Sequence, residues 1–260
     1  MPDIKNQAMK DVILERSNKS ISMYALSGFV LGAGSVAALV VSGIGYRLDW
    51  WPVIEALQIS EWAVFAAMLG LVLSLIGLIL SRPGARRRGL APSLLGLAMS
   101  LPVTIMAVQW EYATRTYPAI NDISTDTEDP PVFWDMPNPT VYPGGTVSEQ
   151  QRAAYPDLAP LELAASPEQA YAIAREIAKD ESWEIIADEP DDGRIEAVDS
   201  SFLYGFKDEV IIRITPSDSG ATVDVRSRSR VGRIDRGVNA KRIRAILATM
   251  KARVSTAKAF

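Results

Sequence analysis

The sequence predicts three membrane-spanning α-helices followed by a soluble α+β domain, which is built as a helix, a four-stranded antiparallel sheet and a second helix. Two observations lead to this fold class. Three long runs without a charged side chain lie in the first 112 of the 260 residues, and each is long enough to cross a hydrocarbon core of about 30 Å. In the second half, the apolar residues repeat first with helical, then with strand, then again with helical spacing.

The uncharged runs span residues 23–46, 62–80 and 90–110. They contain glycines and have almost no polar face, which is typical of membrane helices. Gly28 and Gly32 favour the close approach of another helix, which is either one of this chain or one of a foreign protein. The first run is longer than a usual signal peptide, so we expect an uncleaved anchor. None of the runs holds an ionisable residue, which disfavours transport.

The charges of the loops predict the orientation. Residues 81–89 hold four arginines and no acidic residue, so this loop should remain cytoplasmic. Residues 47–61 hold one basic and three acidic side chains, and tryptophans lie at the expected headgroup depth. Three crossings then place residues 1–22 in the cytoplasm and the domain on the far side. We therefore expect a protein of the bacterial inner membrane with a periplasmic domain.

The chain divides into a cytoplasmic segment (1–22), a transmembrane region (23–112), a proline-rich strap (113–165) and an α+β domain (166–260). Eight prolines and little periodicity predict that the strap is extended. Its aromatic residues either fasten it to the domain or touch a partner. Its acidic residues are candidates for contacts to a partner or a cation, with solvated turn carboxylates as the alternative: Asp122, Asp126, Glu128 and Asp129. Their spacing does not fit an EF-hand, and we predict no metal site.

The domain begins with a helix whose start is marked by three residues. Ser166 is the cap, Pro167 is a proline in the first turn, and Gln169 is the capping-box partner of Ser166. A last helix is predicted at residues 239–254. The connections between the strands are too short for crossover helices, so the sheet should be antiparallel, with the helices on one face. The four predicted strands span residues 183–187, 194–200, 209–215 and 221–231.

The last predicted strand alternates valine and serine with charged residues, so three of its arginines should share one sheet face. The candidate anion- or partner-binding residues are Arg226, Arg228, Arg230, Arg233, Arg236, Asn239 and Arg242. Residues 113–199 hold 5 basic and 19 acidic side chains, whereas residues 200–260 hold 13 and 5. Three interpretations follow: the acidic part neutralises the basic part, a phosphate or lipid headgroup binds, or an acidic protein binds.

The chain has neither histidine nor cysteine, which excludes thiolate nucleophiles, Ser-His-Asp triads and imidazole or thiolate metal ligands. We predict no catalytic residues and no cofactor. Asp199, Asp208 and Glu209 are the candidates for an acid/base pair, with solvated turn residues as the alternative. The glycines form no phosphate-binding motif. A nucleic-acid partner is disfavoured because the domain is net acidic and the expected compartment lacks nucleic acid.

Four separated blocks carry a resemblance to a known family: residues 118–125, residues 193–197, residues 205–208, and a last block of residues 223–233 with 237–244. Over about residues 115–252, the chain resembles domain-of-unknown-function family 1499, which is found in proteobacteria and, in related form, in plastid-bearing organisms. The resemblance implies no catalytic residue, substrate or cofactor, and it does not include the predicted spans.

Three functions remain open. The leading hypothesis is a non-catalytic inner-membrane protein whose periplasmic domain binds or helps to assemble a partner at the membrane surface, with membrane lipids and a membrane protein as partners. The second is binding or carrying of a lipid or another amphiphilic anion on the arginine-lined face. The third is a carboxylate-dependent hydrolase.

Overall fold

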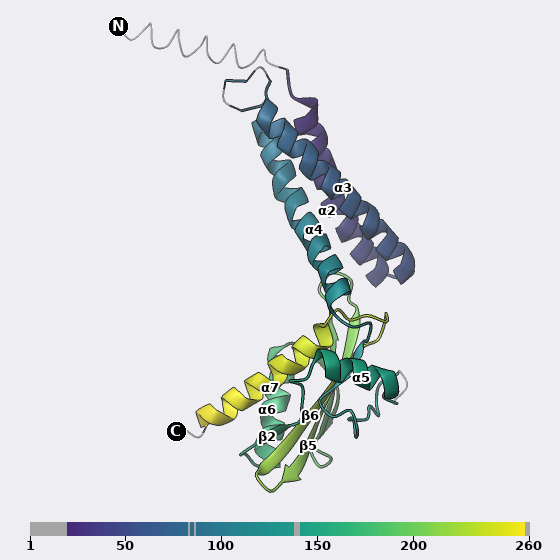
Figure 1. Cartoon of the computed structure of the whole chain (residues 1–260), viewed down its shortest axis with the longest axis vertical. Helices are drawn as coiled ribbons and strands as arrows, with labels where there is room; N and C mark the ends of the chain where they lie inside the picture. Colours follow the sequence, from purple (N-terminus) through teal and green to yellow (C-terminus); the bar gives the residue numbers. More distant parts are fainter. Residues whose placement is uncertain (1–19, 83, 86, 138–140, 258–260) are drawn as a thin grey trace, which may run out of the picture. The chain divides into compact units, whose positions relative to one another are not determined.

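The computed structural model describes residues 20–82, 84–85, 87–137 and 141–257 (Figure 1). The chain forms two compact units, Met1–Gln109 and Trp110–Phe260. Most of the predicted cytoplasmic segment, residues 1–19, lies outside the described residues, as does Arg86 of the arginine-rich loop.

Within the described part of the chain, three helices are long and apolar enough to cross a membrane, as predicted. They are α2 (Met23–Arg47), α3 (Val53–Leu80) and α4 (Leu90–Thr116), and α4 continues into the second unit at Trp110. Helix α3 begins earlier than its uncharged run because the run starts only after Glu61, whereas a helix continues past single charged residues.

Glycines and serines pack the three helices of the first unit closely together. The Oγ of Ser74 in α3 lies against Gly28 of α2 and Gly96 of α4, and a Cβ added to Gly28 would lie 2.6 Å from the backbone nitrogen of Ser74. Ser100 of α4 lies in the same way against Gly32 of α2. The close approach that Gly28 and Gly32 permit is therefore used by helices of this chain.

The sheet that the described residues form has six strands, so the prediction of four was wrong. All pairs are antiparallel, the order is β1-β6-β5-β4-β3, and β2 also pairs with β6. The additional strands, β1 and β2, come from the strap and add to the outer edge of β6. Their three residues each are too few to show an alternating pattern in the sequence. The strands are β1 (Asp122–Ser124), β2 (Leu161–Leu163), β3 (Glu184–Glu189), β4 (Arg194–Ser200), β5 (Lys207–Ser217) and β6 (Gly220–Ser229).

Helices α6 (Pro167–Asp180) and α7 (Val238–Ala257) cover one face of this sheet (Figure 1). Alternate residues of β4, β5 and β6 point toward them and form the main core, which includes Ile195, Ile212 and Val225. The predicted start of α6 is confirmed, because Ser166 caps the helix and forms a capping box with Gln169.

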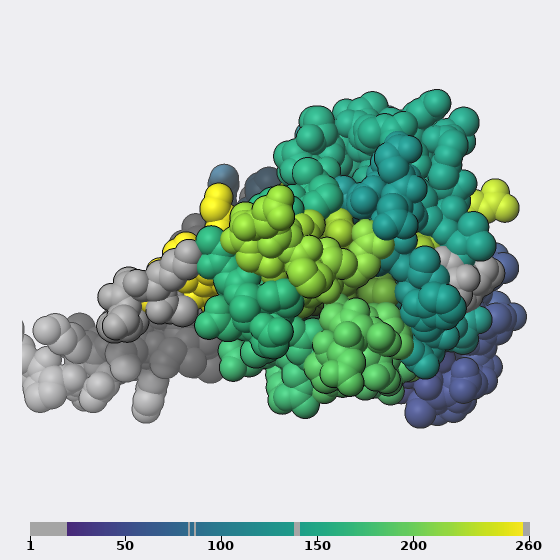
Figure 2. All heavy atoms as spheres, turned by 90° about the horizontal axis from the view of Figure 1, so that it is seen from below, coloured from purple at the N-terminus to yellow at the C-terminus, as the bar shows by residue number. Residues whose placement is uncertain are grey.

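Part of the strap covers the opposite face of the sheet, while other strap residues, among them Ile123 and Tyr155, pack into the main core. The strap contains helix α5 (Gly145–Ala154) in addition to β1 and β2. The side chains of Phe133 and Met136 pack on Val198 of β4 and Ile211 of β5 in a second, smaller core. Figure 2 shows the strap, in teal, gathered beside the light-green end of β5 and β6. The sheet is thus covered by α6 and α7 on one side and by the segment around Phe133 and Met136 on the other.

A carboxylate on β3 ties α6 to the sheet and predicts a pH effect. The hydroxyl of Tyr171 and the Nε of Arg175 each donate to Asp188 at 2.6 Å, and these bonds, that of Tyr171 first, lower the pKa of Asp188 below its ordinary value of 3.8. Because the folded pKa is depressed, the stabilisation is present above pH 3.8 and is lost as the pH falls through the folded pKa.

The melting temperature of the full chain in detergent should therefore fall less between neutral and acidic pH for Asp188→Asn than for the unmodified protein. The exposed Asp191 supplies the control variant, Asp191→Asn, which should follow the unmodified protein. Identical pH profiles for Asp188→Asn and the unmodified protein would contradict the assignment.

Candidate functional site

The predicted arginine face is the sheet face beneath the strap. In the register of the sheet, Arg226 lies opposite Ile211 and Arg228 lies opposite Glu209. Ile211 contacts Phe133 of the strap, whereas the neighbouring Ile212 belongs to the core under the helices. The alternation of β6 therefore turns its arginines toward the strap and its valines toward α6 and α7.

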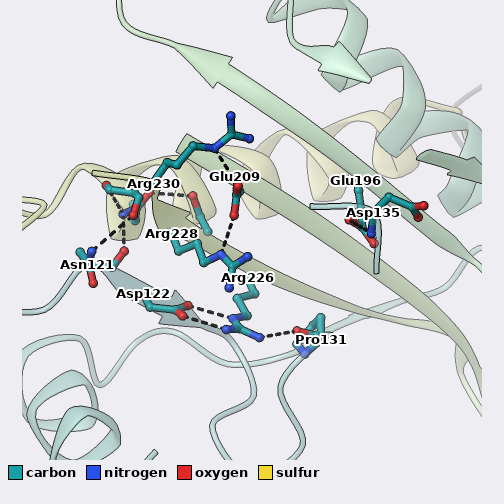
Figure 3. A network of polar contacts seen from close by, with 12 residues as sticks. Asn121, Asp122, Pro131, Asp135, Glu196, Glu209, Arg226, Arg228 and Arg230 are labelled. Carbon is teal, nitrogen blue, oxygen red and sulfur yellow. Dashed lines mark hydrogen bonds and ion pairs between the residues drawn. The ribbon is translucent and has the colours of Figure 1, made fainter. Parts of the chain in front are cut away.

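Arg226 is fully buried, at 0% exposure, and its guanidinium forms a bidentate pair with the carboxylate of Asp122 of β1 (Figure 3). Its Nε donates to Oδ1 at 2.9 Å and its Nη2 to Oδ2 at 2.8 Å. Its Nη1 donates to the carbonyl of Pro131 at 2.9 Å. This two-point geometry is the strongest form of arginine–carboxylate pairing, and both acceptors belong to the strap.

Glu209 of β5 holds the next two arginines of β6 (Figure 3). Arg228 Nε donates to one carboxylate oxygen at 2.6 Å and Arg230 Nε donates to the other at 2.9 Å. The guanidinium of Arg228 also lies 4.2 Å from the ring centre of Phe133, in cation–π geometry. Glu209 is fully buried. Arg226 and Arg228 are therefore enclosed by carboxylates and by the aromatic ring of the strap.

A second buried carboxylate, Glu196 of β4, fixes the backbone of the strap. Its Oε1 accepts the N–H of Trp134 at 2.7 Å and its Oε2 accepts the N–H of Asp135 at 3.1 Å. Arg194 bridges Asp135 and Glu196. The strap is thus anchored at two places, by Asp122 and by Glu196.

Two of the predicted residues lie on the other face, at the start of α7. Arg242 Nη2 donates to Asp199 at 2.7 Å and to Asp208 at 2.8 Å. These two aspartates are direct neighbours across the β4–β5 pair, so the arginine offsets their repulsion. Asn239 accepts from the hydroxyl of Ser227 at 2.8 Å. This cluster links α7 to the end of the sheet.

The last two predicted arginines, Arg233 and Arg236, lie in the connection between β6 and α7. Arg236 Nε donates to the hydroxyl of Thr114 at 2.7 Å, and its guanidinium lies 4.0 Å from the ring centre of Trp110. Arg233 is exposed and forms no ion pair with any residue that the structure describes. The seven predicted residues are therefore distributed over two faces and one end of the domain.

The acidic residues of the strap have partners within the domain. Asp129 accepts from Arg213 of β5 at 2.9 Å, and Glu128 accepts from Arg152 of α5 at 2.9 Å. Asp126 accepts two backbone N–H groups, those of residues 128 and 129, and so closes a turn. Among the described residues, no group of three or more metal-binding side chains comes together.

A pocket of about 440 Å³ opens beside α5. Gln151, at its wall, is bound to the backbone of Ser124 through both its amide nitrogen, at 2.7 Å, and its oxygen, at 3.0 Å. Arg152 at the same wall donates to Thr127 at 2.9 Å. The polar groups of this pocket thus already serve to hold α5 on the strap.

Sequence reasoning missed the buried Glu196, and it named Glu209 only as a candidate acid/base residue and not as the partner of Arg228 and Arg230. Glu209 follows the charged Asp208 and carried no clear signal of burial, whereas Glu196 stands between two apolar residues, Ile195 and Ala197, of a predicted strand. A carboxylate at such a position requires a cation or several N–H donors nearby. The backbone donors of Trp134 and Asp135 carried no such signal, since any residue type supplies an N–H.

Residues 122–250 match the model of the family described as Protein of unknown function (DUF1499). The match begins at β1 and ends within α7, so it includes the whole sheet and most of the strap and leaves out the three apolar helices. No curated protein and no solved structure matches the chain.

Proposed function

We propose that this chain is a membrane-anchored protein whose DUF1499 domain acts without catalysis, by binding a partner protein through a surface centred on Trp134. The domain lies in the periplasm and the three apolar helices hold it at a bacterial inner membrane. The charges of the loops support this orientation, since residues 81–89 carry four arginines and residues 47–61 are net acidic.

The observation that carries the proposal is the contrast between Phe133 and Trp134. Phe133 is fully buried, whereas 69% of Trp134 is exposed. The backbone at Trp134 is nevertheless fixed, because its N–H donates to the buried carboxylate of Glu196. A rigid backbone that presents a large aromatic side chain loses little conformational entropy on binding, and tryptophan is among the residues most enriched at binding hot spots.

The charge network favours partner binding over the two alternatives. An anion carrier needs arginines whose guanidinium groups can bind the anion, but Arg226 and Arg228 already form ion pairs with carboxylates inside the domain. A hydrolase needs a carboxyl group that can exchange a proton with a substrate. Asp199 and Asp208 instead share Arg242.

Trp134→Ala should weaken the complex by about 2 kcal/mol, or about thirtyfold in affinity. The measurement is photo-crosslinking of the full chain in native membranes, with a photoreactive residue at the neighbouring Val132, which is also exposed. The crosslinked adduct should form in the unmodified background and be largely lost with Trp134→Ala. Thermal stability should change little because the indole is mostly exposed.

Val141 provides the matched control, since it is exposed and lies on the same strap. Val141→Ala should leave the adduct unchanged. Equal adduct yields from Trp134→Ala and the unmodified protein would contradict the proposal, as would recovery of the lone chain without any adduct.

A further inference from the structure

One end of the domain is held to the helix that comes from the apolar region. Trp110 is the last residue of the uncharged run of α4, and tryptophan at such a position is typical of the lipid headgroup level. Arg236 contacts both the ring of Trp110 and the hydroxyl of Thr114. A helix rises about 1.5 Å per residue, so Thr114 lies about 6 Å beyond Trp110 along its axis. The connection between β6 and α7 is therefore held close to the level of Trp110.

The loop between β4 and β5 lies beside this connection. The N–H of Arg230 donates to the carbonyl of Lys207 at 2.9 Å, which joins the end of β6 to the start of β5. The loop itself is closed by two backbone bonds, from Ser201 to Phe206 at 2.9 Å and from Gly205 to Ser201 at 2.8 Å. Residues 201–206 are thus a compact loop at the same end of the sheet.

Apolar side chains extend from this end into the surroundings. Phe202 is 94% exposed, the highest value among the large apolar residues of the described chain. Tyr112 is 69% exposed, and Val231 and Trp110 are about half exposed. Arg233, which has no ion pair to a described residue, lies two residues after Val231. Apolar tips beside a basic side chain are typical of surfaces that enter the boundary between lipid headgroups and acyl chains.

We propose that these residues, the lipid-facing rim Trp110, Tyr112, Phe202, Val231 and Arg233, lie on the bilayer surface and bind anionic phospholipid. Phe202 enters the boundary between headgroups and acyl chains, and Arg233 pairs with lipid phosphate. Trp110 and Tyr112 of the rim belong to α4, the helix that comes from the apolar region. The rim therefore lies next to the membrane in every molecule, which favours lipid over a soluble protein as its partner. This inference goes beyond the Trp134 surface and does not depend on it.

The absence of native cysteine allows a direct test. A polarity-sensitive fluorophore is attached through Phe202→Cys in the full chain, which is reconstituted into vesicles of phosphatidylcholine and phosphatidylglycerol. We expect a blue-shifted emission and a loss of fluorescence when lipids carry a spin label near the headgroup. The exposed Val141 supplies the control site, Val141→Cys, whose label should stay water-like and unquenched. Equal spectra and equal quenching at the two sites would overturn the proposal.

The role of Arg233 is tested in the same vesicles. One basic residue near an anionic surface contributes about a fivefold factor to the ratio of docked to undocked domain. Arg233→Gln should therefore lower that ratio about fivefold with phosphatidylglycerol and leave it unchanged in pure phosphatidylcholine. An equal effect in both lipids would overturn the pairing with anionic phosphate. These vesicles contain no partner protein, so Trp134→Ala should not alter the emission or the quenching of the label at Phe202→Cys. A failure of the lipid proposal can therefore be told apart from a failure of the partner proposal.

Discussion

Replacement of Arg226 by methionine is expected to cost the domain about 3–5 kcal/mol of unfolding free energy. The substitution removes the guanidinium that binds both oxygens of Asp122 and leaves this buried carboxylate without a counter-charge. It also leaves the carbonyl of Pro131 without the donor at 2.9 Å. For a domain of this size, the expected fall of the melting temperature is about 10 °C or more.

The measurement is thermal unfolding of the full chain in mild detergent, followed by near-ultraviolet circular dichroism. Arg233→Met is the matched control, because Arg233 is exposed and lacks an ion pair within the described residues, and it should change the melting temperature little. A second variant, Arg226→Met with Asp122→Leu, removes both charges and should recover most of the lost stability. A double variant as unstable as Arg226→Met alone would show that the uncompensated carboxylate is not the cause.

Substitution of Gly28 by valine should loosen the three-helix unit by about 1–3 kcal/mol or more. A Cβ at this position would lie 2.6 Å from the backbone nitrogen and 3.0 Å from the Cα of Ser74. Backbone atoms cannot rotate away as a side chain can, so α2 and α3 would have to separate. The loss of close packing would then extend along both helices.

Gly34 offers a control within the same helix, since a Cβ there meets no atom within 4 Å. Proteolysis of the full chain, purified in mild detergent, should be faster for Gly28→Val than for Gly34→Val. Gly34→Val should be cleaved at the same rate as the unmodified protein. Equal proteolysis rates for the two valine variants would contradict the packing that the structure assigns to Gly28.

The elements with strong periodic signals were predictable from the sequence. The three apolar helices, the cap at Ser166 and the four longer strands all follow from local patterns. Strands β1 and β2 were not predictable, because each forms only through its pairing with β6, which is distant in the chain. Three residues in an extended conformation carry no signal of their own.

The candidate site was predictable only in its local part. The alternation of β6 correctly predicts that Arg226 and Arg228 share a sheet face. It does not predict where α7 packs, and so it could not separate these arginines from Arg242, which lies at the opposite face. The assignment of each carboxylate to an arginine depends on tertiary distance, which sequence spacing does not encode.

The anchoring of the strap also constrains the order of folding. Asp122 and Arg226 are separated by 104 positions in the chain, so during synthesis the strap emerges long before the strand that receives it. Contacts of such long sequence separation form late, after the loop between them has been closed. Until Arg226 has been synthesised, Asp122 lacks the guanidinium that binds it in the folded domain, so this end of the strap can be fixed on the sheet only after β6 is nearly complete.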